Sequence, residues 1–141
     1  MSVNNWLNRK VDEYDQEKID LSILKDLILD LEISIPKKII SIVGTNGKGS
    51  TANLISKILK DNFYSVGLYT SPHLINYNER IGINGINIDD EVLKKYFLKI
   101  EKKINNRKLN FYQMLSLTAF KYFSDNELDI WVLEAGLGGR L

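Results

Sequence analysis

Hydrophobic side chains before Pro36 recur every three to four positions, which is the period of an α-helix. The spacing predicts two amphipathic helices in this part of the chain. The first presents the stripe Val3, Leu7, Val11 and Tyr14, and the second presents Leu24, Leu27, Ile28 and Leu31. Asp20 is suited to cap the start of the second helix.

Three short apolar runs lack this period and predict buried strands. They are "KIISIV" at residues 38–43, "SVGLYT" at residues 65–70 and "DIWVLE" at residues 129–134. In "RIGINGINI", residues 80–88, isoleucine alternates with small or polar residues around Asn84-Gly85. An Asn-Gly pair between alternating positions predicts a β-hairpin.

Helical spacing returns between these strands. A helix that begins near Gly49 is expected to turn four side chains inward, namely Leu54, Ile55, Ile58 and Leu59. The acidic residues 89–91 favour the start of another helix, because carboxylates stabilise a helix N-terminus. Its inward positions are Val92, Leu93, Tyr96, Phe97 and Ile100. Residues 111–123 are apolar nearly all round, which predicts a buried helix.

Strands that alternate with helices predict βαβ units and an α/β fold. We expect a three-layer α/β/α arrangement with a mostly parallel sheet, plus the small β-hairpin. The 141 residues are enough for one domain with its own core.

Composition narrows the class of partner. The 19 basic and 18 acidic residues leave a formal net charge of +1, which gives no electrostatic reason to expect nucleic acid or a membrane surface. The absence of cysteine excludes disulfides and thiolate metal sites. The first residues have no apolar segment of the kind found in signal peptides, so we expect a cytoplasmic protein.

The stretch "GTNGKGST", Gly44–Thr51, lies between a predicted strand and a predicted helix. Gly44 and Gly47 allow a tight turn whose backbone N–H groups converge on one anion, and the helix beginning near Gly49 adds its positive end. Lys48 supplies a mobile charge for the β- and γ-phosphates, and Ser50 or Thr51 a hydroxyl near the metal or phosphate. The spacing differs from G-x-x-x-x-G-K-[ST], because Lys48 follows Gly44 by four residues and a glycine separates it from Ser50. The alternative is an ordinary glycine turn.

Two polar residues also follow strand ends, and in parallel sheets ligands bind at this edge. Glu134 ends an apolar strand, where a carboxylate suits magnesium, which prefers hard oxygen ligands and phosphates. The alternative is a carboxylate that faces solvent. Ser71 is a second candidate ligand, but Ser71-Pro72 on its own favours a simple turn.

The connection from Thr70 to Ile81 is long and therefore a candidate functional loop. It contains His73, the only histidine of the chain. His73 is a candidate for substrate binding, with an ordinary hydrogen-bonded or surface histidine as the alternative. Glu79 and Arg80 are expected to form a structural pair.

Three motifs, "GTNGKGST", "YTSPHLINYNERI" and "VLEAGLGGR", resemble in order and spacing the folylpolyglutamate synthase/dihydrofolate synthase family of the Mur-ligase superfamily. "NWLN" and "IDLSI" resemble the family's N-terminal helix and its entry segment. The resemblance covers essentially residues 1–141 and identifies them as the N-terminal portion of the ATP-binding domain.

The resemblance implies an ATP-dependent, ADP-forming amide ligase that adds L-glutamate to dihydropteroate or reduced folates. The substrate carboxylate is phosphorylated, and the amine of glutamate attacks the acyl phosphate. It also implies that Thr45 to Lys48 contact ATP and that Ser71 and Glu134 bind Mg²⁺. We therefore expect ATP, L-glutamate and a pteroate or folate as ligands, and a monomer when full length.

The resemblance further places the substrate beside Leu21 and beside the segment Asn110, Phe111, Tyr112 and Gln113. This segment departs from the family's T-x-F-E pattern, with asparagine for threonine, tyrosine for phenylalanine and glutamine for glutamate. The family's later magnesium-binding histidine, carbamylated lysine and C-terminal domain have no counterpart in the 141 residues. We therefore expect an N-terminal fragment that is inactive alone. The alternatives are another ATP-utilising enzyme with such a loop, such as a Mur-type ligase or small kinase, and a non-catalytic nucleotide-binding module.

Overall fold

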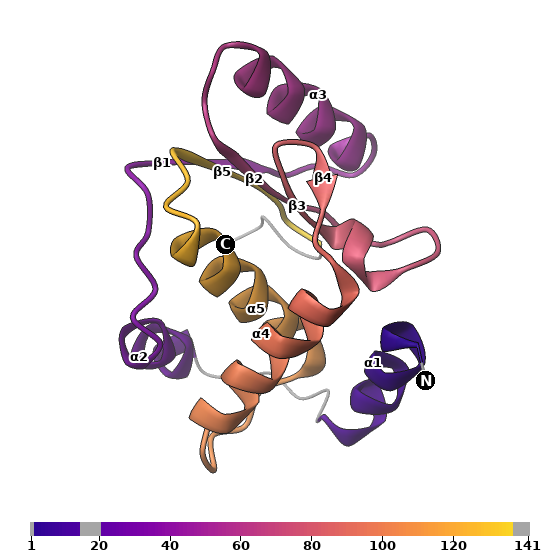
Figure 1. Cartoon of the computed structure of the whole chain (residues 1–141), viewed down its shortest axis with the longest axis vertical. Coiled ribbons are helices and arrows are strands. Elements are labelled where there is room, and N and C mark those ends of the chain that lie inside the picture. The colour runs from indigo at the N-terminus through magenta and orange to yellow at the C-terminus, as the bar shows by residue number, and fades with distance from the viewer. Residues whose placement is uncertain (1, 15–20, 137–141) are drawn as a thin grey trace. The chain divides into compact units, whose positions relative to one another are not determined.

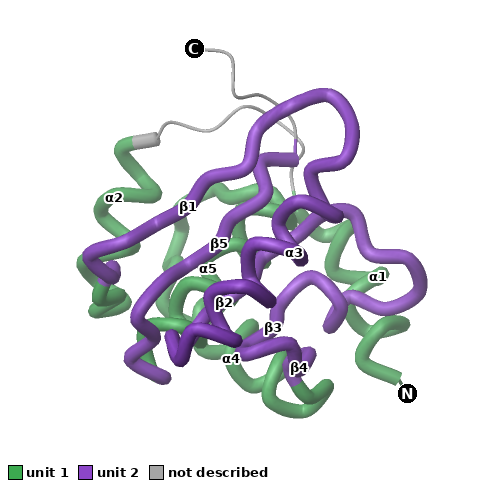
Figure 2. The backbone as a smooth tube through the Cα atoms, turned by 90° about the horizontal axis from the view of Figure 1, so that it is seen from above, with its two compact units in different colours: residues 1–34, 89–125 green, residues 35–88, 126–141 purple. Residues whose placement is uncertain are grey.

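The computed structural model describes residues 2–14 and 21–136. The chain divides into two compact units, residues 1–34 with 89–125 and residues 35–88 with 126–141 (Figure 2). The first unit is helical, and the second contains the sheet and one long helix. Asp20, the expected helix cap, lies outside the described residues.

The sheet unit has five strands in the order β1-β5-β2-β3-β4. They are β1 (Lys38–Ile42), β2 (Val66–Tyr69), β3 (Ile81–Ile83), β4 (Ile86–Asn87) and β5 (Ile130–Glu134). β5 pairs in parallel with β1 on one side and with β2 on the other. β3 and β4 extend the sheet as an antiparallel hairpin beside β2. The predicted α/β fold with its parallel core and added hairpin is confirmed.

The hairpin turns where the sequence predicts. Asn84 and Gly85 have φ of 51° and 80°, which are the positive angles that a two-residue turn between twisted strands requires. The Asn84 side chain also accepts a hydrogen bond from the Val66 N–H at 2.8 Å, which ties the turn to β2. Turn chemistry therefore sets the register of this edge.

Helix α3 (Lys48–Asp61) lies along the sheet (Figure 1). Its Ala52 packs with Val66 and Val132 in a cluster that Ile55 and Leu59 complete. The predicted inward stripe is half wrong, because Leu54 and Ile58 are 60% and 52% exposed. The buried stripe is rotated toward Ala52 and Ser56, whose small side chains let the helix approach the sheet closely.

The helical unit contains α1 (Val3–Glu13), α2 (Leu21–Asp30), α4 (Asp90–Lys103) and α5 (Phe111–Asp125). Asp89 caps α4 by accepting hydrogen bonds from the N–H groups of Glu91 at 2.9 Å and Val92 at 3.3 Å. Phe97 of α4 is fully buried and meets Trp6 of α1 edge-to-face, with ring centroids 5.4 Å apart. The buried character predicted for residues 111–123 is confirmed by eight buried residues of α5.

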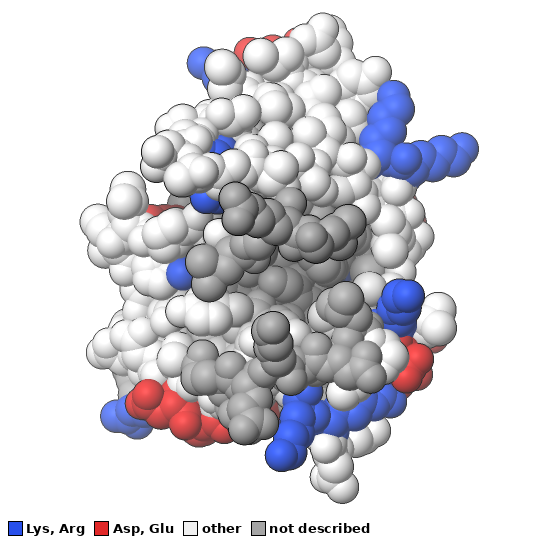
Figure 3. All heavy atoms as spheres, turned by 180° about the vertical axis from the view of Figure 1, so that it is seen from behind, with Lys and Arg blue, Asp and Glu red and all other residues white. Residues whose placement is uncertain are grey.

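Side chains of both charges are distributed over the surface. On the face drawn in Figure 3, Lys and Arg side chains lie in several places, some of them next to Asp and Glu side chains. Among the described residues, no helix combines the length and apolarity needed to cross a bilayer.

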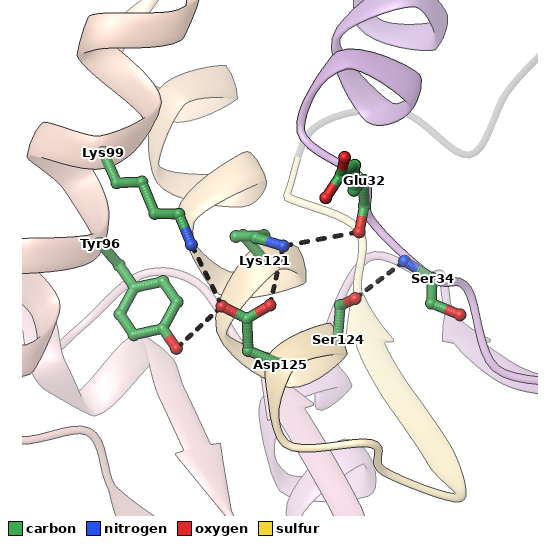
Figure 4. Close-up of polar contacts among 7 residues, drawn as sticks. All are labelled: Glu32, Ser34, Tyr96, Lys99, Lys121, Ser124 and Asp125. Atoms are coloured by element: carbon green, nitrogen blue, oxygen red, sulfur yellow. Dashed lines mark hydrogen bonds and ion pairs between the residues drawn. The ribbon is translucent and has the colours of Figure 1, made fainter.

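Lys121 of α5 is a charged residue inside the helical unit, only 7% exposed. Its ammonium lies 2.7 Å from a carboxylate oxygen of Asp125 and 3.5 Å from the carbonyl oxygen of Glu32 (Figure 4). Asp125 also accepts a hydrogen bond from the Tyr96 hydroxyl at 3.1 Å. Next to this group, the Ser34 N–H donates to the Ser124 hydroxyl at 2.8 Å, so the segment after α2 is fastened to α5.

Two opposing effects act on the pKa of Asp125. Burial raises it, but the hydrogen bond and positive charge of Lys121, with help from Lys99, outweigh burial and hold the pKa below its ordinary value of 3.8. For Tyr96, burial and then the nearby Asp125 charge raise the pKa to about 12. The cluster is therefore most stable with Asp125 ionised.

Asp125→Ala should destabilise the protein by about 1–2 kcal/mol, because it leaves the Lys121 ammonium buried without its counter-charge. Since the folded pKa lies below the unfolded value, the contribution of Asp125 is complete above pH 3.8 and is lost as pH falls through the folded pKa. Urea denaturation at several pH values measures both effects. Lys99→Met is the control, because its 3.4 Å pair has a lysine side chain 51% exposed and should change stability by less than about 0.5 kcal/mol. Equal losses in the two variants would contradict the argument.

Candidate functional site

Three chain segments meet at the carboxyl edge of the parallel strands. In the register of the sheet, Ile42 of β1 pairs with Glu134, and Tyr69 of β2 pairs with Leu133. The Ala135 N–H continues the ladder to the Ile42 carbonyl at 3.0 Å. The glycine loop after β1, the loop after β2 and Glu134 therefore lie at one edge, as the sequence predicts.

The glycine loop connects β1 to α3 through two glycines with positive φ, Gly44 at 150° and Gly47 at 72°. A side chain at either position would strain the backbone. Gly47 is the N-cap of α3 and makes no side-chain cap, so the first N–H groups of the helix remain available for an anion. A Cβ at Gly44 would lie 3.9 Å from Cγ of Lys48, so the lysine stem runs back along the loop.

The remaining loop residues divide by role. Thr45 and Asn46 are exposed within the turn. The Thr51 hydroxyl donates to the Gly47 carbonyl at 2.9 Å, which fastens the loop to the first turn of α3. Ser50 is exposed, and its hydroxyl has no hydrogen-bond partner in the described part of the chain. Of the two hydroxyls proposed for a phosphate or metal, that of Ser50 is the more available.

Glu134 is a buried carboxylate, 7% exposed, at the centre of this edge. Its Oε2 accepts a hydrogen bond from the Ser71 N–H at 3.0 Å. Oε1 has no hydrogen-bond partner within residues 2–14 and 21–136. The two candidate metal ligands thus lie side by side, and the Ser71–Pro72 peptide bond after them is cis.

Two glycines border the Glu134–Ser71 pair, a feature that the sequence patterns did not reveal. A Cβ at Gly49 would lie 3.5 Å from Oε2 of Glu134, and a Cβ at Gly136 would lie 3.1 Å from Oγ of Ser71. The second distance is tight enough to displace the serine hydroxyl. The glycines therefore leave room directly beside both oxygens.

The donor set fits a hard divalent cation. Among the described residues there is no group of three or more His, Cys, Asp or Glu that could enclose a metal. A magnesium ion does not require one, because it keeps several waters and uses one or two protein oxygens plus phosphate. One buried carboxylate, one hydroxyl and an adjacent anion cradle meet this need.

The loop after β2 is held in shape by Glu79, which lies in a short 3₁₀ turn, Tyr77–Arg80. Its carboxylate accepts hydrogen bonds from the N–H groups of Leu74 at 2.7 Å, Ile75 at 3.1 Å and Asn76 at 2.7 Å. These bonds, with that from Leu74 foremost, lower the pKa of Glu79 below its ordinary value of 4.5. The loop is thus a preformed structure.

Arg80 closes the same loop. The Thr70 N–H donates to its carbonyl at 3.0 Å, and its Nε–H donates to Nδ1 of His73 at 2.8 Å. Burial, followed by the Arg80 charge, lowers the pKa of His73. Glu79 and Arg80 thus both stabilise the loop, Glu79 through backbone N–H groups and Arg80 through Thr70 and His73.

The chain resembles known proteins in both sequence and fold. No protein-family model matches the chain. A dihydrofolate synthase/folylpolyglutamate synthase from Buchnera aphidicola subsp. Acyrthosiphon pisum is 38% identical, over 99% of this chain and 34% of its own length. The bifunctional folylpolyglutamate synthase/dihydrofolate synthase from Yersinia pestis, complexed with AMPPNP and Mn ion, is 32% identical with a TM-score of 0.90, over 100% of this chain and 35% of that chain.

The chain is homologous, over its whole length, to the folylpolyglutamate synthase/dihydrofolate synthase family. E. coli FolC in complex with DHPP and ADP agrees, with a TM-score of 0.89 at 30% identity, over 100% of this chain and 34% of that chain. The chain therefore spans about a third of the length of these relatives.

The substrate segment that the resemblance to these synthases suggests lies at the start of α5. Asn110 and Gln113 form a reciprocal cap, in which each side-chain oxygen accepts the other's backbone N–H, at 2.9 and 3.0 Å. Phe111 is fully buried beside Phe97, with ring centroids 5.9 Å apart, so its side chain serves the core and the expected substrate contact is not available to it. Tyr112 is 48% exposed and is the member of the segment that can reach a ligand. Leu21 begins α2, but its side chain lies outside the described residues.

Glu79→Ala should release the loop after β2, because three backbone N–H groups lose their common acceptor. We expect the Leu74, Ile75 and Asn76 amides to lose protection in hydrogen exchange followed by NMR. In the wild type the same protection should hold above pH 4.5 and decline as pH falls through the lower folded pKa, since only the carboxylate accepts all three bonds. Exposed Glu91→Ala is the control. Unchanged protection in Glu79→Ala would show that something else holds the loop.

Proposed function

We propose that this chain is the nucleotide-binding part of an ATP-dependent, ADP-forming amide ligase that joins L-glutamate to dihydropteroate or a folate. The observation that carries the proposal is the meeting, at one sheet edge, of the glycine loop with the buried Glu134 and with Ser71. The printed names of the relatives support the rest, since those structures contain Mn ion with AMPPNP, and DHPP with ADP. In this proposal residues 1–141 are the N-terminal portion of the ATP-binding domain of a cytoplasmic enzyme that is monomeric when full length.

Each residue of the edge has a defined task in the proposal. The backbone N–H groups of the loop from Gly44 to Thr51 hold the phosphates of ATP, and Lys48 offsets the charge of the γ-phosphate as it is transferred. Ser71 and Glu134 hold Mg²⁺, which supplies Lewis-acid stabilisation of the phosphate oxygens when bound. The glycines at 49 and 136 leave space for that ion and its waters.

The chemistry explains why such a site is needed. A carboxylate does not react readily with an amine, because its oxygen is a poor leaving group. Transfer of the γ-phosphoryl group to the substrate carboxylate gives an acyl phosphate, from which the glutamate amine displaces phosphate. The residues of this chain position the donor and stabilise charge, and they need form no covalent bond themselves. His73 and Tyr112 are the proposed side-chain contacts to the pteroate or folate, and Asn110 and Gln113 hold the segment that carries Tyr112.

The deciding experiment follows ADP release by the intact protein with dihydropteroate or tetrahydrofolate, with and without L-glutamate. Lys48→Ala should weaken ATP binding by about 1.5–3 kcal/mol, because one charge-assisted phosphate contact is lost, and should nearly abolish ADP release. Lys57→Ala, an exposed lysine farther along α3, is the matched control. Glutamate-independent ADP release would favour a kinase, and wild-type turnover in Lys48→Ala would refute the phosphate cradle.

The metal assignment has a separate test. Glu134→Gln keeps the shape of the side chain and its acceptor for the Ser71 N–H, but removes the charge that a cation needs. Calorimetric ATP affinity should therefore fall about tenfold in Mg²⁺ and stay unchanged in EDTA. Exposed Glu91→Gln should alter neither value. A Glu134→Gln affinity that falls equally under both conditions would mean that Glu134 serves the fold and not the ion.

A further inference from the structure

The contact between Arg80 and His73 fixes which nitrogen of the imidazole carries the proton. Arg80 is 6% exposed, and its Nε–H donates to Nδ1 of His73 at 2.8 Å. A guanidinium has only donors and stays protonated, so Nδ1 must be the acceptor. A neutral imidazole has one N–H, and here it must be on Nε2.

The imidazole is also held in place by its neighbours in the loop. Its ring lies on Tyr77 with centroids 4.3 Å apart, and Cζ of Arg80 lies 5.8 Å from the same tyrosine ring. The backbone on both sides is fastened by the Thr70 to Arg80 hydrogen bond and by Glu79. Orienting the histidine therefore costs little further entropy when a ligand arrives.

The outer ring nitrogen of the imidazole, Nε2, is available to bind a ligand. Nε2 of His73 has no hydrogen-bond partner among residues 2–14 and 21–136, and the residue is only partly buried. His73 follows Ser71 by two positions, in the loop that leaves the carboxyl edge beside the phosphate cradle. A donor that is oriented and unused at this edge is suited to a ligand.

We propose that Arg80 is a positioning residue that keeps His73 in the Nε2–H tautomer, so that the loop presents one oriented N–H donor to an oxygen or ring nitrogen of the acid substrate. This inference deepens the proposed function and rests on it for the identity of the ligand. Arg80 itself touches no substrate. The loop thereby gains a donor that discriminates for substrates with an acceptor at that position.

The tautomer can be measured directly, because His73 is the only histidine of the chain. Long-range ¹H–¹⁵N NMR of the labelled 141-residue protein at neutral pH should show a single Nε2–H tautomer. Arg80→Met should give a mixture of tautomers, and Arg80→Lys should restore the Nε2–H form in part, since an ammonium can donate to Nδ1. A wild-type protein with Nδ1–H, or with a tautomer mixture, overturns the inference whatever the variants do.

Two isosteric variants test the ligand contact in the intact enzyme. Gln at position 73 places its amide N–H₂ near the position of Nε2, whereas Asn places its oxygen near Nδ1 and has no donor at the outer position. We expect His73→Gln to keep the KM for dihydropteroate within about threefold and His73→Asn to raise it about five- to tenfold, the worth of one hydrogen bond. The KM for MgATP should stay unchanged in both.

The outcomes separate this inference from the proposed function. Equal KM values for dihydropteroate in the Gln and Asn variants would overturn the substrate contact, while glutamate-dependent ADP release would leave the ligase proposal intact. Absence of that release in the wild type would refute the ligase proposal, and the substrate contact with it. The NMR result would then still decide whether Arg80 sets the tautomer.

Discussion

The hydrogen bond from the Ser71 N–H to Glu134 is the contact on which the site depends. It joins the loop after β2 to the end of β5 while keeping one carboxylate oxygen and one hydroxyl beside each other. A buried carboxylate needs such a partner, because an unpaired one would carry a large desolvation cost. It also favours glycine at position 136, since a Cβ there would press on the serine hydroxyl at 3.1 Å. The geometry of the site therefore depends both on the hydrogen bond that stabilises the buried Glu134 carboxylate and on the small size of the neighbouring glycine.

The sequence predicts those parts of the structure that are determined by neighbouring residues in the chain. The strands follow from short apolar runs, and the turn at Asn84-Gly85 follows from its demand for positive φ. The shared edge of the glycine loop, Ser71 and Glu134 follows from topology, because carboxyl ends of parallel strands coincide. Helix α3 shows the limit, since hydrophobicity alone favours Leu54 and Ile58 where the sheet accepts Ala52 and Ser56. Closeness of approach depends on the partner surface, which the helix sequence does not contain.

The role of a polar side chain is hard to predict from its residue type, even when its partner is close in the sequence. Glu79 and Arg80 are expected from the sequence to form a structural pair. In the structure, Glu79 accepts hydrogen bonds from three backbone N–H groups, and Arg80 donates one to His73. The resemblance suggests that Asn110 and Gln113 are substrate residues, but in the structure they cap a helix. The pattern N-x-x-Q before an apolar helix is a capping signal that the sequence already contains. Phe111 is one of the apolar residues that bury α5, so its side chain lies in the core. Residue type is thus a weaker guide than the identity of the partner atom.

The order in the loop after β2 has a consequence for how the site works. Glu79 orders the backbone, Arg80 orders the imidazole, and the Thr70 to Arg80 bond closes the loop at its base. Each bond is made within the loop, so its shape does not have to be created by the ligand. A site that is ordered in advance can direct binding energy to the reacting groups. In the proposed reaction, a phosphoryl group is transferred and the acyl phosphate must be kept from water, so a fixed loop beside a fixed phosphate cradle would keep donor and acceptor aligned.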